Sequence, residues 1–81
     1  GELNFMNQPL KEILATLQRE YAVQFVINAR LFTPDLYTIK FRGHEDIDTV
    51  MKILTLTAGG LTYQIDGNTI TIYSLNKKGV K

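Results

Sequence analysis

One short run of residues has the types and spacing to bind a metal ion. His44, Glu45, Asp46 and Asp48 bring one imidazole and three carboxylates close together along the chain, and such groups can ligate a divalent cation. The same residues also suit the start of a helix, where free N–H groups and the helix dipole favour acidic side chains. His44 is the only histidine, and a site with a single histidine has few ligands for tight binding. We therefore predict a helix start here and no metal site.

Other catalytic or cofactor-binding groups are scarce. The chain has no cysteine, and its only serine, Ser74, follows the last predicted strand. Gly59-Gly60 and Asp66-Gly67 have the composition of phosphate-binding loops, but a phosphate cradle leads into the N-terminus of a helix. Here the first pair follows a predicted helix and the second joins two predicted strands. Both are interpreted as turns, and we expect no catalytic residue, no cofactor and no enzymatic activity.

The aromatic residues divide into a set predicted to lie in the core and a set that the pattern assigns neither to the core nor to the surface. Four occupy the inward positions of alternating segments: Phe5, Phe25, Phe41 and Tyr63. The others could join Val26 in an exposed apolar area, and surface aromatics of that kind favour a protein partner: Phe32, Tyr37 and Tyr73.

The last strand is a second possible contact surface. The segment from Asn68 to Tyr73 carries neither charge nor proline, so at the edge of a sheet it could accept a strand from another chain. The alternative is that it lies inside the sheet, or that the Lys77-Lys78 tail blunts it. The residues predicted to contact a partner are Val26, Phe32, Thr69, Thr71 and Tyr73.

Composition limits what such surfaces can bind. Of the 81 residues, 44% are hydrophobic and 21% charged, and the formal net charge is +1. This is enough apolar material for one small core but too little positive charge for the phosphate backbone of nucleic acid. The longest uncharged stretch, Ile53 to Ile65, is too short and too polar to span a membrane. Because a predicted strand follows Gly1 directly, we expect the chain to be a segment of a longer protein.

Hydrophobic periodicity predicts two copies of strand, helix and strand, followed by one more strand. The first copy has strand positions Leu3 and Phe5, a helix capped by Asn7 or Gln8 with Pro9 in its first turn, and a strand from Tyr21 to Ile27. The second has a strand from Tyr37 to Phe41 ended by Gly43, a helix ended by Gly59-Gly60, and a strand from Leu61 to Ile65. Asp66-Gly67 then predicts a hairpin into the final strand.

The two copies match position by position, which predicts one shared core. The helical stripes are Leu10, Ile13, Leu14, Leu17 and Ile47, Val50, Met51, Leu54. The strand pairs are Phe5 with Phe41, Val23 with Tyr63, and Phe25 with Ile65. We predict a single α+β domain over residues 1–81, with its core in 3–73 and a tail at 74–81.

The same residues resemble a known family over the span from Leu3 to Tyr73. The matching pattern is Phe5-x-Asn7-x-Pro9-Leu10-Lys11-Glu12-Ile13-Leu14-x-x-Leu17, Tyr21-x-Val23-x-Phe25-x-Ile27, Tyr37-x-Ile39-x-Phe41 and Leu61-Thr62-Tyr63-x-Ile65-x-Gly67-Asn68-x-Ile70-x-Ile72. It is similar to the C-terminal domain of FecR-type anti-sigma regulators from Bacteroidetes. More loosely, it is similar to the secretin and TonB-receptor N-terminal (STN) signalling domain.

This resemblance implies a fold and a function. It implies two helices between a two-stranded and a three-stranded sheet. It also implies a periplasmic domain of an inner-membrane regulator, which contacts the signalling domain of a TonB-dependent outer-membrane transporter. The sigma factor would be bound through a region N-terminal to this chain. The alternatives are the signalling domain of a TonB-dependent receptor, or a module that binds a small ligand or peptidoglycan. No catalytic residue is implied.

Overall fold

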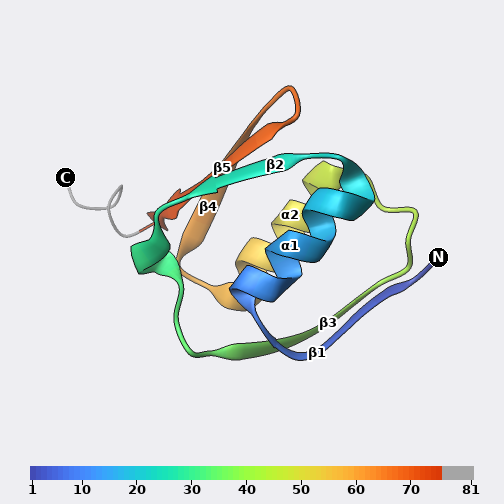
Figure 1. Ribbon diagram of the computed structural model, residues 1–81, viewed down its shortest axis with the longest axis horizontal. Coiled ribbons are helices and arrows are strands. Elements are labelled where there is room, and N and C mark those ends of the chain that lie inside the picture. The colour runs from blue at the N-terminus through green and yellow to red at the C-terminus, as the bar shows by residue number, and fades with distance from the viewer. Residues whose placement is uncertain (76–81) are drawn as a thin grey trace.

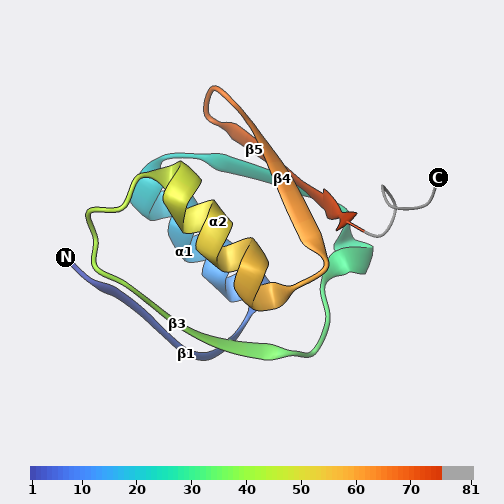
Figure 2. The same ribbon diagram turned by 180° about the vertical axis from the view of Figure 1, so that it is seen from behind.

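Two helices lie side by side between two small sheets in the computed structural model (Figure 1 and, from behind, Figure 2). The structure describes residues 1–75, so most of the predicted tail, including Lys77 and Lys78, lies outside the described residues. The strands are β1 (Leu3–Pro9), β2 (Gln24–Ile27), β3 (Leu36–Phe41), β4 (Leu61–Asp66) and β5 (Thr69–Ser74). The helices are α1 (Leu10–Tyr21), α2 (Ile47–Ala58) and the short 3₁₀ helix η1 (Ala29–Leu31).

The sheets have different pairing patterns. β1 and β3 form an antiparallel two-stranded sheet. The second sheet has the order β2-β5-β4, in which β5 runs parallel to β2 and antiparallel to β4. In Figure 1 the first sheet lies below the helix pair and the second lies above it. The predicted α+β class, with two strand-helix-strand units and a final strand, is confirmed.

The core lies where the two helical stripes meet the inward faces of both sheets. Corresponding positions are buried alike: Ile13 and Val50 are fully buried, and so are Leu17 and Leu54 to within 1% exposure. Phe5 and Phe41 pack edge to face, with ring centroids 6.2 Å apart, a favourable aromatic geometry. The duplication inferred from the sequence therefore holds in the packing of the core.

The ends of α1 differ from the prediction. Pro9 itself occupies the N-cap, with an extended backbone and no side-chain cap, because β1 continues to that residue and includes Asn7. Asn7 has φ +50° at an irregularity of β1, and its N–H bonds to Thr38 Oγ1 at 3.1 Å. At the other end Tyr21 closes the helix rather than starting a strand, and Ala22 takes the left-handed conformation beyond it.

The turns predicted in the second half are confirmed. Gly43 follows β3 with φ +99°, and Gly59 ends α2 with φ +76°, conformations that favour glycine. The two residues between β4 and β5 form the hairpin predicted from Asp66-Gly67. The turn at Gly59 connects α2 to β4, and the hairpin connects β4 to β5. Together they determine the position of the larger sheet over the helices.

Candidate protein-interaction face

The acidic run after β3 organises the start of α2. The Glu45 carboxylate accepts hydrogen bonds from the backbone N–H groups of Arg42 and Gly43, at 2.9 and 3.0 Å. Asp46 is the N-cap and accepts from the N–H of Thr49 at 2.9 Å. These backbone bonds lower the pKa of Glu45 and of Asp46. The predicted helix start is confirmed, and within residues 1–75 no three acidic or histidine side chains are grouped to hold a metal ion.

Of the two positions considered for the last strand, the free edge is wrong and the interior position is confirmed. β5 is the central strand of its sheet: Thr71 lies opposite Val26 of β2 on one side and opposite Gln64 of β4 on the other. Its backbone therefore has no unpaired side for another chain to join. The polar pattern from Asn68 to Tyr73 arises because alternate side chains point away from the helices, and not because the strand lies at an edge.

Most of the predicted contact residues nevertheless share one surface. In β5 the side chains of Ile70 and Ile72 are buried against the helices, so the alternate side chains point to the opposite side of the sheet. We call this side the outer sheet face, and it consists of Gln24, Val26, Thr62, Gln64, Asp66, Thr69, Thr71 and Tyr73. Both views show the helices only on the other side of this sheet (Figures 1 and 2).

The outer sheet face offers hydrogen-bonding groups on a flat support. Val26 is 51% exposed and lies beside Thr71. The Tyr73 hydroxyl donates a hydrogen bond to Oε1 of Gln64, which lies on the neighbouring strand β4. Asp66 is the only charged residue of this face, so its chemistry is that of hydroxyls, amides and one aliphatic patch. Such a surface suits contact with another protein.

Four members of this face were not among the contact residues predicted from the sequence: Gln24, Thr62, Gln64 and Asp66. The available signal was the alternation of polar residues with Tyr63 and Ile65 in β4. It indicated that these positions face away from the core, but only the pairing of β4 with β5 places them beside Thr71 and Tyr73.

Phe32 lies apart from the outer sheet face. It follows η1, and both Phe32 and Tyr37 are half-buried against the core. The exposed apolar area proposed for them with Val26 and Tyr73 is therefore not formed. Phe25 and Tyr63, which were predicted to face inward, do pack against the core and are half-buried there. The exposed large apolar side chains are scattered over several elements: Met6, Val26, Leu36, Leu56 and Leu75.

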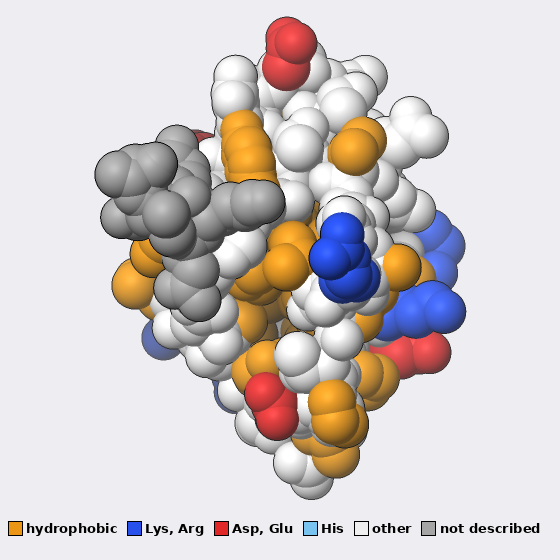
Figure 3. Space-filling model, turned by 90° about the vertical axis from the view of Figure 1, so that its left-hand side faces the viewer, with side chains coloured by type: hydrophobic (Ala, Val, Ile, Leu, Met, Phe, Trp, Pro, Cys, Tyr) orange, Lys and Arg blue, Asp and Glu red, His pale blue; other side chains and the backbone are white. Residues whose placement is uncertain are grey.

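Two shallow hollows flank η1 at one end of the molecule. One, of about 330 Å³, is lined by Arg30, Leu31 and the end of β5, including Tyr73. The other, of about 250 Å³, shares Arg30 and Leu31 and reaches Leu61. Figure 3 shows this end, where hydrophobic side chains are visible in a hollow beside a basic side chain. The hollows extend the accessible surface from the outer sheet face towards η1.

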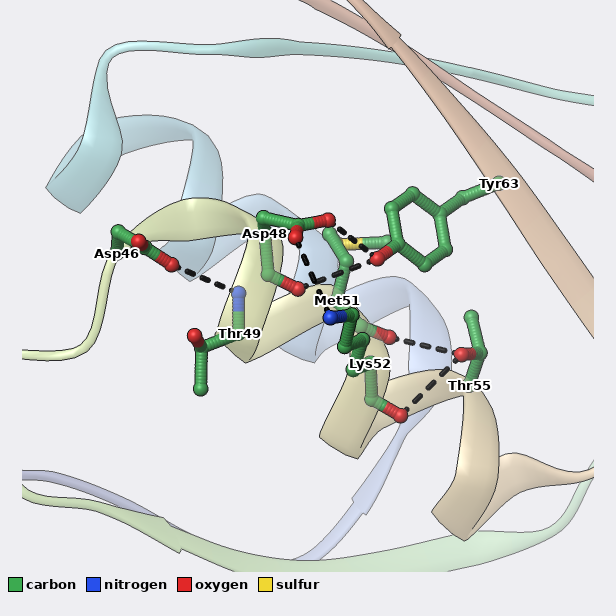
Figure 4. A network of polar contacts seen from close by, with 7 residues as sticks. All are labelled: Asp46, Asp48, Thr49, Met51, Lys52, Thr55 and Tyr63. Atoms are coloured by element: carbon green, nitrogen blue, oxygen red, sulfur yellow. Dashed lines mark hydrogen bonds and ion pairs between the residues drawn. The ribbon is translucent and has the colours of Figure 1, made fainter.

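Tyr63 fixes β4, and with it the outer sheet face, to helix α2 (Figure 4). Its hydroxyl donates to the Asp48 side chain and also approaches the Asp48 carbonyl oxygen at 3.2 Å. Partial burial and the Asp48 carboxylate raise the pKa of Tyr63 to about 12. Lys52 lies 3.6 Å from the same carboxylate. Tyr21 makes a comparable link, donating to the Glu45 carbonyl oxygen at 2.8 Å.

The fold is shared with solved structures of regulatory and secretion proteins. One is a protein assigned as an anti-sigma factor from Parabacteroides distasonis ATCC 8503, with TM-score 0.76 and 19% identity over 91% of this chain and 34% of the other. Another is the N-terminal domain of the secretin XcpQ from Pseudomonas aeruginosa, with TM-score 0.66 and 13% identity over 91% of this chain and 36% of the other. The chain thus spans about a third of the length of each. No curated protein matches it.

Helices between a two-stranded and a three-stranded sheet, with a polar outer face and an apolar core, define a small α+β domain with the fold of these structures. The family is given by the sequence match, which covers residues 2–72 with the model of the FecR C-terminal domain. The chain belongs to this family, as its residue pattern predicted. No helix among the described residues is long and apolar enough to cross a membrane.

Proposed function

We propose that this chain is the periplasmic protein-interaction domain of a transmembrane anti-sigma regulator. In this proposal it receives a signal from a TonB-dependent outer-membrane transporter and relays it towards a sigma factor, which binds another part of the regulator. The observation that carries the proposal is the family match over residues 2–72. The outer sheet face, which none of the described helices covers, supports it, because it provides a surface for contact with another protein.

The proposed mechanism is differential binding. A transporter domain that binds one arrangement of the regulator more tightly than another shifts the population towards that arrangement. The core-facing side of the sheet is occupied by the helices, so the outer sheet face is the side of this sheet on which a partner can dock. We place the contact around Val26, Thr71 and Tyr73, with Thr69 at its margin. Phe32, apart from that face, would contribute only if the contact extends past η1.

The test uses the full-length regulator and the N-terminal signalling domain of the transporter whose gene accompanies it. Thr71→Arg places a long charged side chain in the middle of the outer sheet face, and we expect it to weaken binding about tenfold or more, since a bulky unpaired charge at the centre of an interface is costly. The readouts are calorimetric titration of the two proteins and a sigma-dependent reporter in cells.

A matched control is available on helix α2. Thr57→Arg makes the same substitution on an exposed helical residue, and we expect wild-type binding and signalling. Both variants should keep the circular dichroism spectrum and thermal unfolding of the wild type. Equal affinity of Thr71→Arg and wild type would reject the outer sheet face as the contact. Absence of any binding by the wild type would reject the proposed relay.

A further inference from the structure

The strands at the edges of the two sheets differ in how well they are protected against pairing with a strand of another chain. β1 is interrupted by the irregularity at Asn7 and ends on Pro9. β3 carries Lys40. Charges, prolines and irregularities are the usual means by which proteins prevent edge-to-edge pairing. Both edges of the smaller sheet are thus protected against pairing with another strand.

β2, one edge of the larger sheet, is short and partly covered. Gln24 donates its N–H towards β5, to the Asn68 carbonyl oxygen at 2.8 Å, so the next N–H, that of Phe25, points away from the sheet. That N–H donates to Gln18 Oε1 of α1 at 3.0 Å. A side chain from α1 therefore occupies the position that an added strand would need.

No residue that the structure describes gives such protection to β4, the other edge. Leu75 donates to the Gly60 carbonyl oxygen at 2.8 Å, and hydrogen-bonded pairs alternate along an antiparallel ladder. The N–H and C=O groups of Leu61, Tyr63 and Ile65 consequently point away from β5, and among residues 1–75 they have no hydrogen-bond partner. The strand is six residues long and contains neither proline nor charge before Asp66.

We propose that this edge pairs with β4 of a second copy of the chain, to give a two-fold symmetric dimer with one continuous six-stranded sheet. The free groups lie on alternate residues, so an antiparallel two-fold pairing centred on Tyr63 joins all of them. Leu61 then lies opposite Ile65 of the second copy, and Thr62 opposite Gln64. A two-fold interface presents the same patch on both partners, and this strand is complementary to itself.

The charges near the edge agree with a second copy as the occupant. In this register Asp66 lies opposite Gly60 of the second copy, so no like charges face each other across the strands. Helix α2 packs beneath β4 and presents the oppositely charged Lys52 and Asp48 at its surface, 67% and 53% exposed. Tyr63, on which the two-fold pairing is centred, bonds to Asp48, so in the dimer we expect this charged pair to lie near the axis, close to the opposite charges of the second copy. The arrangement goes beyond the proposed function and does not depend on it.

The test measures the mass of the 81-residue chain by analytical ultracentrifugation from micromolar to millimolar concentration. The wild type is expected to dimerise. Thr62→Lys combined with Gln64→Lys places two lysine pairs directly opposite each other, and should raise the dimer dissociation constant about tenfold or more. The same should hold for Thr62→Glu combined with Gln64→Glu. Equal amounts of the two variants should form a mixed dimer.

The control puts the same charges on the same face at the other edge: Gln24→Lys combined with Val26→Lys should dimerise like the wild type. A wild type that stays monomeric at every concentration overturns the proposal. The edge of β4 would then be a site for pairing with a strand of a different protein. Failure of the lysine and glutamate variants to form a mixed dimer overturns the register. Loss of the dimer in the control variant assigns the association to another surface and also overturns it.

Discussion

A single hydroxyl joins the larger sheet to helix α2. We expect Tyr63→Phe to lower the free energy of unfolding by about 1 kcal/mol, because it removes a hydrogen bond to a charged group that is partly solvated. Tyr73→Phe is the matched control, since its hydroxyl bonds to the neutral amide of Gln64, and its effect should be smaller. Urea unfolding of both variants measures the difference, and equal losses would contradict the role assigned to Asp48.

The acidic residues at the start of α2 predict an acid dependence of stability. The pKa values of Glu45 and Asp46 are lowered in the folded chain from 4.5 and 3.8. Their contribution is therefore present above those values and is lost as the pH falls through the lower, folded pKa values. Glu45→Gln combined with Asp46→Asn should make stability less sensitive to pH below about 4.5. Urea midpoints at neutral and acid pH check this, and an unchanged acid dependence would count against it.

At the scale of elements, each helix is defined by one buried stripe. Leu17 is fully buried on α1, and we expect Leu17→Ala to cost about 2 to 5 kcal/mol by creating a cavity. Leu56 lies two residues after the buried Leu54, on the far side of α2, and is 82% exposed. Leu56→Ala should therefore change stability by about 0.5 kcal/mol or less. Chemical denaturation of the two variants tests whether the loss in free energy of unfolding depends on how deeply the replaced leucine is buried.

Periodicity predicted which side of each element faces the core, because burial repeats with the helical or strand period. It did not predict which strands are neighbours. The pairing of β2 with β5 joins strands that are far apart in the sequence, with β3, α2 and β4 between them, and no local pattern encodes it. The end of α1 was misplaced for a related reason: Tyr21 fits both a helix and the alternation of Val23 and Phe25, and its link to the Glu45 carbonyl oxygen is long-range.

The candidate site was also predicted only in part, because the sequence shows which side of a strand is exposed but not which strands are neighbours. The sequence identified Val26, Thr71 and Tyr73 as surface residues, and three-dimensional pairing was needed to show that they are adjacent. Phe32 could not be assigned because the 3₁₀ helix η1 before it has no periodic signal, and that helix was not predicted. The prediction that these residues contact a partner remains to be tested by the variants described above.

For the whole molecule, both halves contribute to one core, so unfolding should be a single cooperative transition. We expect the circular dichroism and tyrosine fluorescence curves to coincide in urea, since helix loss and exposure of the core would occur together. Val50→Ala in the second half should shift both curves equally, as Leu17→Ala in the first half should. Separate midpoints for the two probes would show that the halves unfold independently.

The central position of β5 also governs the order in which the chain can reach its native state. β5, which fills the space between β2 and β4, is synthesised after both of them, and until it arrives those strands have no common neighbour. Pairings between distant parts of a chain form late and slowly. A ribosome-bound nascent chain that ends before Thr69 would therefore have its helices but not its larger sheet, and folding would be completed only after the final strand has emerged.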